Sequence, residues 1–338
     1  MKVSVILSCL LFAVNYVAHS QTKVVSQNLT LGGRSLPAIT HVTDMKIDGD
    51  TLYFVYETRN GYGQRFLQSA LIDKANNRLE IGSEIGKKEN GYYESYMPNP
   101  FFDIEKGIHV ASQDVCEIYD LSTGGRLTKT KKYLISSNSS VPLSLSQYVQ
   151  DVFMISPESY VFIGREPKGG AQYAITENIT TEKVDTIRKI AISPKLSSWM
   201  PNSGELACSV KYNRLAFGYS FYPIIEFFGM DGKLMKQVRV SKDTFNPKTL
   251  KEADFEDSNP WHFVDITQTD NYIYALYWGY RYTDSQKPTV ASTIYQINWE
   301  GDIVNRYVVS KSLRRIACSN DNLLIGWSGR QFIKISLP

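Results

Sequence analysis

A short polar turn followed by an apolar run recurs six times along this chain, and this repeat limits the folds open to it more than any other feature. Each copy places two polar or small residues directly before the apolar run, whose first residues are Leu52, Ile108, Tyr160, Leu215, Tyr272 and Leu323. These anchors lie 56, 52, 55, 57 and 51 residues apart. A period of about 50 residues without a helical pattern between copies is typical of β-propeller blades or of a β-solenoid.

Each repeat divides into four short β-strands. In the first copy, 45–47 and 52–56 flank a tight turn, and an outer pair of strands follows at 66–72 and 78–81. Asp and Gly residues, such as Asp231-Gly232, mark the outer turns because they tolerate the positive φ of tight hairpins. The 22 Tyr, 15 Phe and 5 Trp suit strands, where aromatic rings pack on a pleated surface.

The two ends of the sequence favour a closed ring over an open solenoid. The sixth repeat has only one strand, 332–335, after its second strand, so its fourth strand is missing. A spare strand candidate, Val24 to Leu31, precedes the first full repeat. Propellers commonly close by pairing both ends in one blade, which removes an exposed sheet edge. We therefore predict an all-β, six-bladed β-propeller with four antiparallel strands per blade, closed by an N-terminal strand in the last blade.

Residues 1–20 have the pattern of a secretory signal peptide. Lys2 provides the charged start, Val3 to Ala13 form an apolar stretch, and Ala18 and Ser20 are the small residues that a signal peptidase reads. The apolar stretch is too short for a transmembrane helix. We expect cleavage near Ser20, a mature protein of residues 21–338 that forms a single propeller domain without a transmembrane segment, and a secreted or periplasmic location.

The net charge and the number of cysteines bear on the possible partners and on disulfide bonding. The formal net charge is +3, which does not indicate nucleic acid as a partner. Cys116, Cys208 and Cys318 remain after the predicted cleavage, and an odd number makes a poor disulfide framework. Cys208 and Cys318 occupy equivalent places in their repeats, so we expect small buried residues on innermost strands, with a disulfide between them as the alternative.

The repeat and its blade endings resemble a known family. A signal peptide, six degenerate blades with a turn before each second strand, and an ending such as 294–301 (IYQINWEG) are similar to the TolB-like six-bladed propellers exported by Bacteroidetes. The resemblance covers about 24–338. It implies a scaffold that binds other envelope proteins. The sequence lacks the separate N-terminal α/β domain of TolB, so TolB's own partners are not implied.

Propellers bind ligands at the ends of the central channel, and the repeat predicts which residues gather there. The loops that lead into the innermost strands, and those that join second to third strands, share one face of the ring. The candidate ligand-binding residues on this face are Arg59, Arg165, Trp199, Trp261, His262, Arg281, Arg314 and Arg330. Arginine suits carboxylate or phosphate because its planar fork makes paired hydrogen bonds. Together with Arg315 these residues could form a basic, aromatic-rimmed mouth. The alternative is that the arginines are solvated and pair with nearby acids.

Three aspartates stand at the start of the innermost strands. Asp44, Asp151 and Asp265 belong to blades one, three and five, and could together bind a cation through oxygen ligands. The alternative, which we favour, is that they accept hydrogen bonds from backbone amides. No spacing typical of a calcium loop is present, and we predict no metal site.

The function predicted from these features is non-catalytic recognition of an anionic small ligand, a glycan or an envelope protein. We recognise no zinc motif, nucleophile elbow or phosphate loop, and we assign no catalytic residue and no cofactor. The alternative is a carbohydrate- or peptide-directed hydrolase or lyase on the same face, which would use His262 or His41 with a neighbouring carboxylate.

Overall fold

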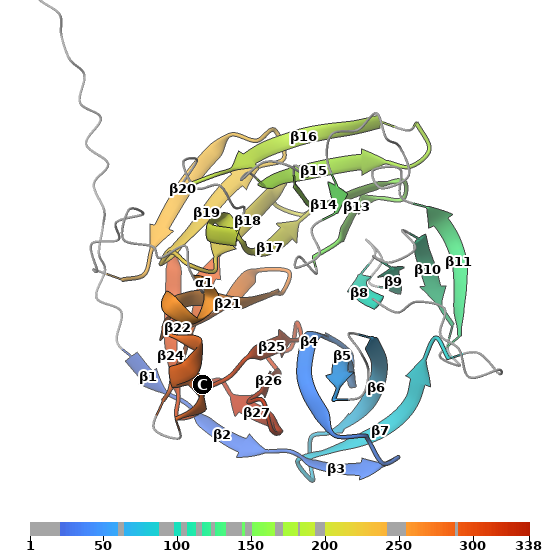
Figure 1. The fold of residues 1–338 in the computed structure, drawn as a ribbon, viewed down its shortest axis with the longest axis vertical. Helices are drawn as coiled ribbons and strands as arrows, with labels where there is room; N and C mark the ends of the chain where they lie inside the picture. Colours follow the sequence, from blue (N-terminus) through green and yellow to red (C-terminus); the bar gives the residue numbers. More distant parts are fainter. Residues whose placement is uncertain are drawn as a thin grey trace, which may run out of the picture.

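Six sheets stand in a ring around a central axis, as the repeat predicts (Figure 1). The structure is a computed structural model that describes residues 21–59, 64–87, 98–102, 107–112, 117–122, 126–132, 144–145, 151–165, 172–181, 183–192, 200–241, 255–287 and 290–338. Within a blade, successive strands pair with their neighbours from the channel outward. The protein is therefore a six-bladed β-propeller.

The first three blades follow one another from the N-terminal side. Blade 1 consists of β4 (Ile39–Asp48), β5 (Thr51–Thr58), β6 (Arg65–Asp73) and β7 (Arg78–Ile85). Blade 2 consists of β8 (Pro98–Phe102), β9 (Ile108–Ser112), β10 (Glu117–Leu121) and β11 (Leu127–Lys132). Blade 3 consists of β12 (Ser144–Leu145), β13 (Phe153–Ser156), β14 (Ser159–Arg165), β15 (Gln172–Asn178) and β16 (Lys183–Ile190). Both β12 and β13 pair with β14, so two short strands share the innermost position of blade 3.

The last three blades repeat the same plan. Blade 4 consists of β17 (Gly204–Ser209), β18 (Arg214–Tyr219), β19 (Ile224–Gly229) and β20 (Leu234–Arg239). Blade 5 consists of β21 (Trp261–Gln268), β22 (Tyr272–Tyr280), β23 (Ser292–Asn298) and β24 (Ile303–Val309). Blade 6 begins with β25 (Arg315–Cys318), β26 (Leu324–Trp327) and β27 (Phe332–Ser336).

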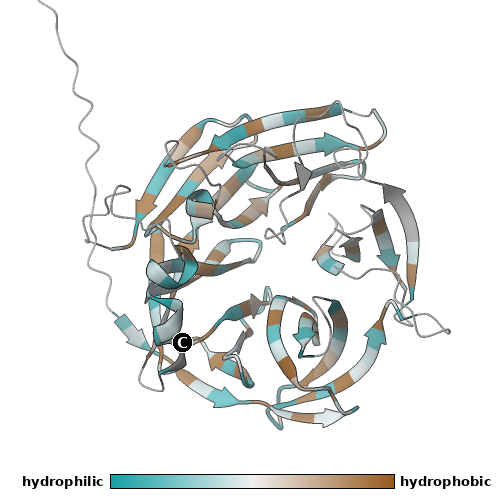
Figure 2. Ribbon diagram, in the orientation of Figure 1, coloured by the Kyte–Doolittle hydropathy of each residue, from teal (hydrophilic) through white to brown (hydrophobic). Residues whose placement is uncertain are grey.

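The hydrophobic core lies between blades rather than inside them. Each cluster of buried apolar side chains that the described residues form joins two neighbouring blades around the ring. Hydrophobic and hydrophilic residues alternate along many of the strands (Figure 2), because successive side chains point to opposite faces of a strand. Each blade therefore buries its apolar side chains against the blade next to it.

The polar dipeptides of the repeat form the turns between first and second strands. Asn213 and Asn322 have φ of 53° and 64°, and Gly49 has φ of 53°. These left-handed conformations are accessible to Gly and tolerated by Asn, which is why such residues recur at this point of the blade. The sequence repeat is thus the repeat of one hairpin turn.

The N-terminal segment closes the ring across three blades. β1 (Gln21–Lys23) pairs in parallel with β24 of blade 5, β2 (Val25–Asn28) pairs antiparallel with β27 as the fourth strand of blade 6, and β3 (Thr30–Gly33) pairs in parallel with β7 of blade 1. The predicted pairing into the last blade is confirmed. In Figure 1 the three strands follow one another along the outer rim. We call Gln21–Gly33 the N-terminal strap.

The innermost strands are also bonded from blade to blade. The Gln268 amide donates to the Cys208 carbonyl and accepts from the Cys208 N–H at 2.6 and 2.8 Å, which joins blade 5 to blade 4. The Cys318 N–H donates to the Thr267 hydroxyl, which joins blade 6 to blade 5. Cys208 and Cys318 are buried, free thiols on innermost strands, as expected, and they are not joined in a disulfide. Cys116 lies outside the described residues.

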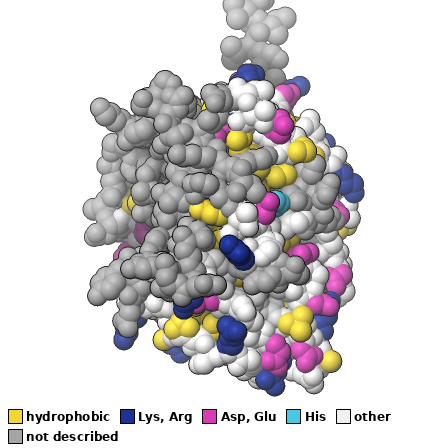
Figure 3. Space-filling view, turned by 90° about the vertical axis from the view of Figure 1, so that its right-hand side faces the viewer, with side chains coloured by type: hydrophobic (Ala, Val, Ile, Leu, Met, Phe, Trp, Pro, Cys, Tyr) yellow, Lys and Arg dark blue, Asp and Glu magenta, His cyan; other side chains and the backbone are white. Residues whose placement is uncertain are grey.

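Helix is confined to short turns in the described part of the protein. These are η1 (Met200–Asn202), α1 (Phe255–Ser258) and η3 (Tyr282–Gln286). Over the same residues, no helix has both the length and the apolar character needed to cross a bilayer. In Figure 3, a view of the ring from the side, acidic and basic side chains are interspersed over the part of this face that is coloured by residue type.

Candidate functional site

One end of the ring collects the loops that the sequence singles out. Antiparallel strands place the start of each first strand and the end of each second strand at the same end of the blade. The segments before β21 and β25 and the turns after β22 and β26 therefore share this end. We call it the loop face.

Beneath the loop face, charged side chains from five blades meet at the channel. They come from innermost strands or the residues just before them, and they are Asp44, Lys46, Asp151, Glu205, Asp265 and Arg315. We call this group the channel cluster. Four carboxylates and two cations leave a formal charge of −2 when all are ionised.

Arg315 ties four blades together from the centre of the cluster. Its Nε donates to the Thr43 carbonyl at 2.9 Å, and Nη1 donates to the Val264 carbonyl. The same Nη1 lies 3.5 Å from Glu205 Oε1 and 3.8 Å from Asp265 Oδ1. The side chain is therefore a strut between blades 6, 1, 5 and 4. The prediction that Arg315 lines a basic mouth is wrong, since this guanidinium is engaged with acids and carbonyls.

The three aspartates accept hydrogen bonds from backbone amides, as we favoured. Asp151 Oδ2 accepts from the Leu206 N–H at 2.8 Å, and Asp265 Oδ2 accepts from the Ile316 N–H at 2.6 Å, each across a blade boundary. Asp44 Oδ1 accepts from the next N–H in its own strand and from Lys46 Nζ at 3.0 Å. Among the described residues, no group of acids, histidines and cysteines has the geometry to hold a metal ion.

Burial sets the protonation of this cluster. Burial raises the pKa of Asp151 to about 6, against the opposing attraction of Lys46. Burial also raises the pKa of Glu205 well above its usual value, and a hydrogen bond to Asp151 adds to the effect. Although burial alone would lower the pKa of Lys46, Asp44 and Asp151 raise it. Lys46 and Arg315 therefore stay charged. Asp151 and Glu205 take up protons at a higher pH than exposed carboxylates do.

Trp261 and His262 lie at the start of β21 and are held by their surroundings. The indole Nε1 of Trp261 donates to the Glu256 carbonyl at 2.9 Å, and the ring packs on Phe221 with centroids 4.9 Å apart. His262 is 8% exposed, and its Nδ1 lies 3.1 Å from the Tyr277 hydroxyl. The side chains of Trp261 and His262 therefore pack within the protein, and little of His262 is exposed to a ligand.

His41, the other histidine named for the hydrolase alternative, is half exposed on β4. Its Nδ1 is 3.9 Å from Glu57 Oε2, which is beyond hydrogen-bond distance. Glu57 is instead bonded by Arg65 Nε at 3.0 Å. This arrangement does not form an acid–base pair with His41.

The structure brings three of the predicted arginines toward the junction of blades 5 and 6. Arg314 Nη1 donates to the Tyr282 hydroxyl at 3.2 Å, and its guanidinium lies over that ring, 5.2 Å from the centroid. Arg281 is exposed and immediately precedes Tyr282 in η3. Arg330 is exposed in the turn after β26, next to Gly329, against which Arg314 packs.

The other predicted site residues either lie in other blades or fall outside the described residues. Arg59 is exposed after β5 in blade 1. Arg165 ends β14 in blade 3, where its backbone pairs with Ser144, and its side chain lies outside the described part. Trp199 lies outside the described residues.

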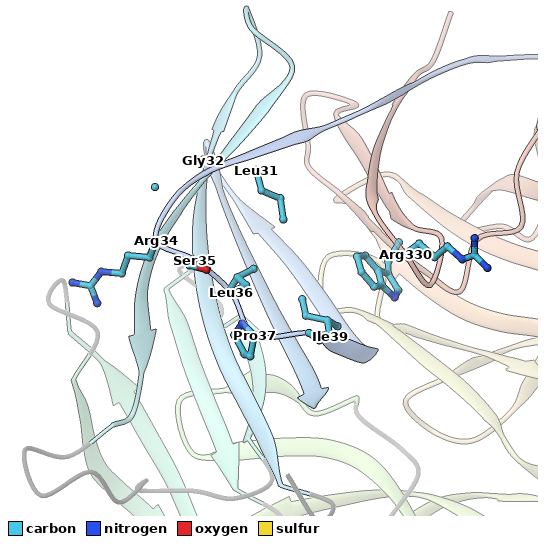
Figure 4. Close-up of a pocket in the computed structure, with 11 residues that line it drawn as sticks. Leu31, Gly32, Arg34, Ser35, Leu36, Pro37, Ile39 and Arg330 are labelled. Carbon is cyan, nitrogen blue, oxygen red and sulfur yellow. The ribbon is translucent and has the colours of Figure 1, made fainter. Parts of the chain in front are cut away.

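A pocket opens where the strap turns from blade 6 into blade 1. It has a volume of about 570 Å³ and is lined by 31–39, Trp327 and Arg330 (Figure 4). We call it the seam pocket. Figure 4 shows the side chains of Leu31, Leu36 and Ile39 toward the middle, and the guanidinium groups of Arg34 and Arg330 directed away on opposite sides. Aliphatic side chains therefore form part of the lining, and the two guanidinium groups lie outside the pocket.

Of the residues that line the seam pocket, only Arg330 was predicted from the sequence to bind a ligand. Its wall is the segment that follows the predicted closing strand, and Gly32-Gly33 is the one local signal. Gly33 has φ of +74°, and a Cβ there would lie 2.6 Å from the Ile81 carbonyl oxygen. Glycine lets the backbone approach β7 and then turn sharply inward over blade 1.

Comparison with known proteins defines the fold class alone. No family model and no curated protein matches the sequence. A Bacteroides vulgatus protein of the DUF4221 family is similar in structure over 94% of this chain and 96% of its own, with a TM-score of 0.57 and 11% identity. A Bacteroides thetaiotaomicron protein of unknown function matches over 94% of this chain and 76% of its own, with a TM-score of 0.53 and 9% identity.

An enzyme also appears among the similar structures. Virginiamycin B lyase from Staphylococcus aureus matches over 94% of this chain and 99% of its own, with a TM-score of 0.44 and 11% identity. At that level the likeness has no bearing on activity. The protein is a six-bladed β-propeller of the same fold as the two Bacteroides proteins.

Proposed function

We propose that this protein is a non-catalytic recognition propeller that binds an anionic ligand, or an anionic group of an envelope protein, at the loop face of blades 5, 6 and 1. The observation that carries the proposal is the seam pocket, a concave site of a size usual for small-molecule recognition, with Arg34 and Arg330 at its edges. Arg281 and Arg314 extend the basic surface along the neighbouring blade boundary.

Positive charge on this face is available for a ligand. Arg330 and Arg281 are exposed, so their guanidinium groups keep their hydration and can exchange it for a carboxylate or phosphate. Arg314 is held by Tyr282 in a fixed orientation, which lowers the entropy lost on binding. The channel cluster lies below this face, and we place recognition at the surface and in the seam pocket.

The location that we propose is outside the cytoplasm, in the manner of the exported TolB-like propellers that the sequence resembles. The predicted cleavage would make Gln21 the first residue, and Gln21 is the first residue of β1. Mass spectrometry of the protein exported by its native host tests this directly: a mature N-terminus at Gln21 supports export, and an intact N-terminus in the cytosol refutes it.

A thermal-shift screen of the purified protein tests the recognition proposal. The probes are acidic glycans, neutral glycans, short peptides and small carboxylic acids, each at low salt and at about 0.5 M salt. We expect stabilisation by acidic probes that weakens with salt, because exposed charge pairs are screened.

Two arginine variants and one control locate the site. Arg330→Ala and Arg281→Ala should reduce the shift, while Lys233→Ala removes an equal charge from an exposed turn at the opposite end of blade 4 and should not. If acidic probes stabilise all three variants as they do the unaltered protein, the loop face is the wrong site. If neutral probes bind as well as acidic ones, anion recognition is wrong.

A further inference from the structure

Gln21, the first residue of the strap, has a side chain that can react with a new N-terminus. The predicted cleavage after Ser20 makes Gln21 the first residue of the mature protein and gives it a free α-amino group. We propose that Gln21 then closes to pyroglutamate, and that the guanidinium group of Arg306 promotes the closure. This inference rests on the export that the proposed function includes, and it concerns the outer rim of the ring and not the loop face.

Strand pairing places Gln21 directly beside Arg306. β1 pairs in parallel with β24, and Gln21 is opposite Arg306 in the register. With the side-chain amide of Gln21 oriented to fit its neighbour, its oxygen accepts hydrogen bonds from Nη1 and Nη2 of Arg306 at 2.7 and 3.0 Å. Both bonds therefore end on the carbonyl group that the α-amino group would attack.

Arg306 is held in place, and its charge is not neutralised by an acid. Its guanidinium carbon lies 5.7 Å from the ring centroid of Tyr295, the residue opposite it on β23. No ion pair joins Arg306 to an acidic side chain in the described part of the chain. The positive charge of Arg306 therefore acts on the Gln21 amide without a competing carboxylate.

The reaction is balanced within Gln21 itself. The α-nitrogen attacks Cδ of the side-chain amide and the N–Cδ bond forms. The bond from Cδ to the amide nitrogen then breaks, and ammonia leaves with one proton of the α-amino group. Negative charge develops on the amide oxygen during the attack, and two N–H donors aimed at that oxygen stabilise it, as in an oxyanion hole.

Closure also removes a repulsion between charges at the start of the strap. Before closure, the α-ammonium group of Gln21 lies on β1 beside the guanidinium group of Arg306 on β24, and like charges on neighbouring strands repel. Pyroglutamate carries no charge, and it keeps a carbonyl oxygen that can accept from Arg306. The modified strap should therefore hold more firmly to blade 5.

Arg78 offers a matched control for Arg306. It also lies on an outer strand beside the strap, on β7, where its guanidinium group approaches Gly32. It is paired with Glu80 at 2.6 Å, and β7 pairs with β3 and not with β1. Replacing either arginine with leucine removes a cation next to the strap, but only Arg306→Leu removes the donors to Gln21.

Mass spectrometry of the exported protein tests the modification. An N-terminal peptide that begins at Gln21 and has lost one molecule of ammonia supports the inference. A free α-amino group on Gln21 overturns the inference and leaves the proposed export standing, and so does cleavage at another position. Retention of residues 1–20 in the cytosol overturns the inference and the proposed location together, while recognition at the loop face is tested separately.

A time course on purified protein tests the role of Arg306. A removable N-terminal fusion is cut directly before Gln21, and cyclisation is followed by mass spectrometry beside a reference peptide with the sequence of 21–28. We expect the folded protein to cyclise at least about tenfold faster than the peptide, a comparison that needs no variant. Arg306→Leu should lower the rate to that of the peptide, and Arg78→Leu should leave it unchanged. Equal rates in protein and peptide, or a rate that Arg306→Leu does not change, overturn the inference.

Discussion

Replacing Arg315 with leucine should destabilise the ring more than any surface change, because one side chain holds four blades at the channel. The variant loses donors to two backbone carbonyls, those of Thr43 and Val264. It also leaves Glu205 and Asp265 without their nearest cation, and changes the formal charge of the channel cluster from −2 to −3. Removing one partner of a buried ion pair typically costs about 3–5 kcal/mol.

Thermal and urea unfolding measure this loss. A cost of about 3–5 kcal/mol corresponds to roughly 4–7 °C in Tm for a protein of this size. Arg281→Leu is the matched control, since that arginine is exposed on the same face and its loss should cost less than about 0.5 kcal/mol. The double variant with Glu205→Gln should recover part of the loss, because the carboxylate that Arg315 compensates is removed.

The pH dependence separates this explanation from simple loss of packing. Without Arg315 the neighbouring carboxylates resist ionisation further, so the cost of the substitution should increase as pH rises from about 5 to 8. A loss below about 1 kcal/mol, or a larger loss that is the same at every pH, would refute the role of Arg315 as a charged strut.

Three further predictions concern other parts of the ring. The pKa of Asp151 is raised from 3.8 to about 6 in the folded state, so the native protein binds this proton more tightly than the unfolded chain does. The contribution of Asp151 to stability is therefore greatest below about pH 4 and falls by about 3 kcal/mol as pH rises through 6. Asp151→Asn should remove this dependence of the unfolding free energy on pH, measured by urea unfolding. Gly33→Ala should cost about 2–4 kcal/mol and speed hydrogen exchange in the strap, because φ is +74° and the new Cβ would meet a β7 carbonyl; Gly49→Ala, with φ of +53° and open space, should cost only about 1 kcal/mol. Burial raises the pKa of Cys318 to about 12 and also raises that of Cys208, so iodoacetamide should modify both only on unfolding; rapid labelling of the native protein would contradict their burial.

The blades could be predicted from sequence because the information is local. A turn that needs Asn or Gly at positive φ, as at Asn213 and Asn322, leaves a residue signature at each repeat. The spare strand before blade 1 was also visible, since a sixth blade without a fourth strand demands one. Its division into three strands was not, because pairing of β1 with β24 and of β3 with β7 depends on edges that only the closed ring brings alongside.

The chemistry was harder to predict because it is distributed over distant blades. Arg314 and Arg315 are adjacent in sequence, yet one lies over Tyr282 at the surface and the other enters the channel among carboxylates. Arg314 lies in the bend before β25, whereas Arg315 is the first residue of that strand, so one prediction could not serve both. Asp151 and Asp265 were correctly predicted as acceptors for amides, but their donors belong to the next blade.

Recognition at the seam would link ligand binding to closure of the propeller. One wall of the seam pocket is the end of the strap and the segment that follows it, and the other is Trp327 of blade 6. A ligand between them contacts both only while β2 and β3 are docked, so it binds the closed ring and not the open one. By mass action, a ligand at about one hundred times its Kd would stabilise the closed state by about 2.7 kcal/mol. Hydrogen exchange in β2 and β3 should therefore slow on ligand binding, whereas exchange in β18, a central strand of blade 4, should not.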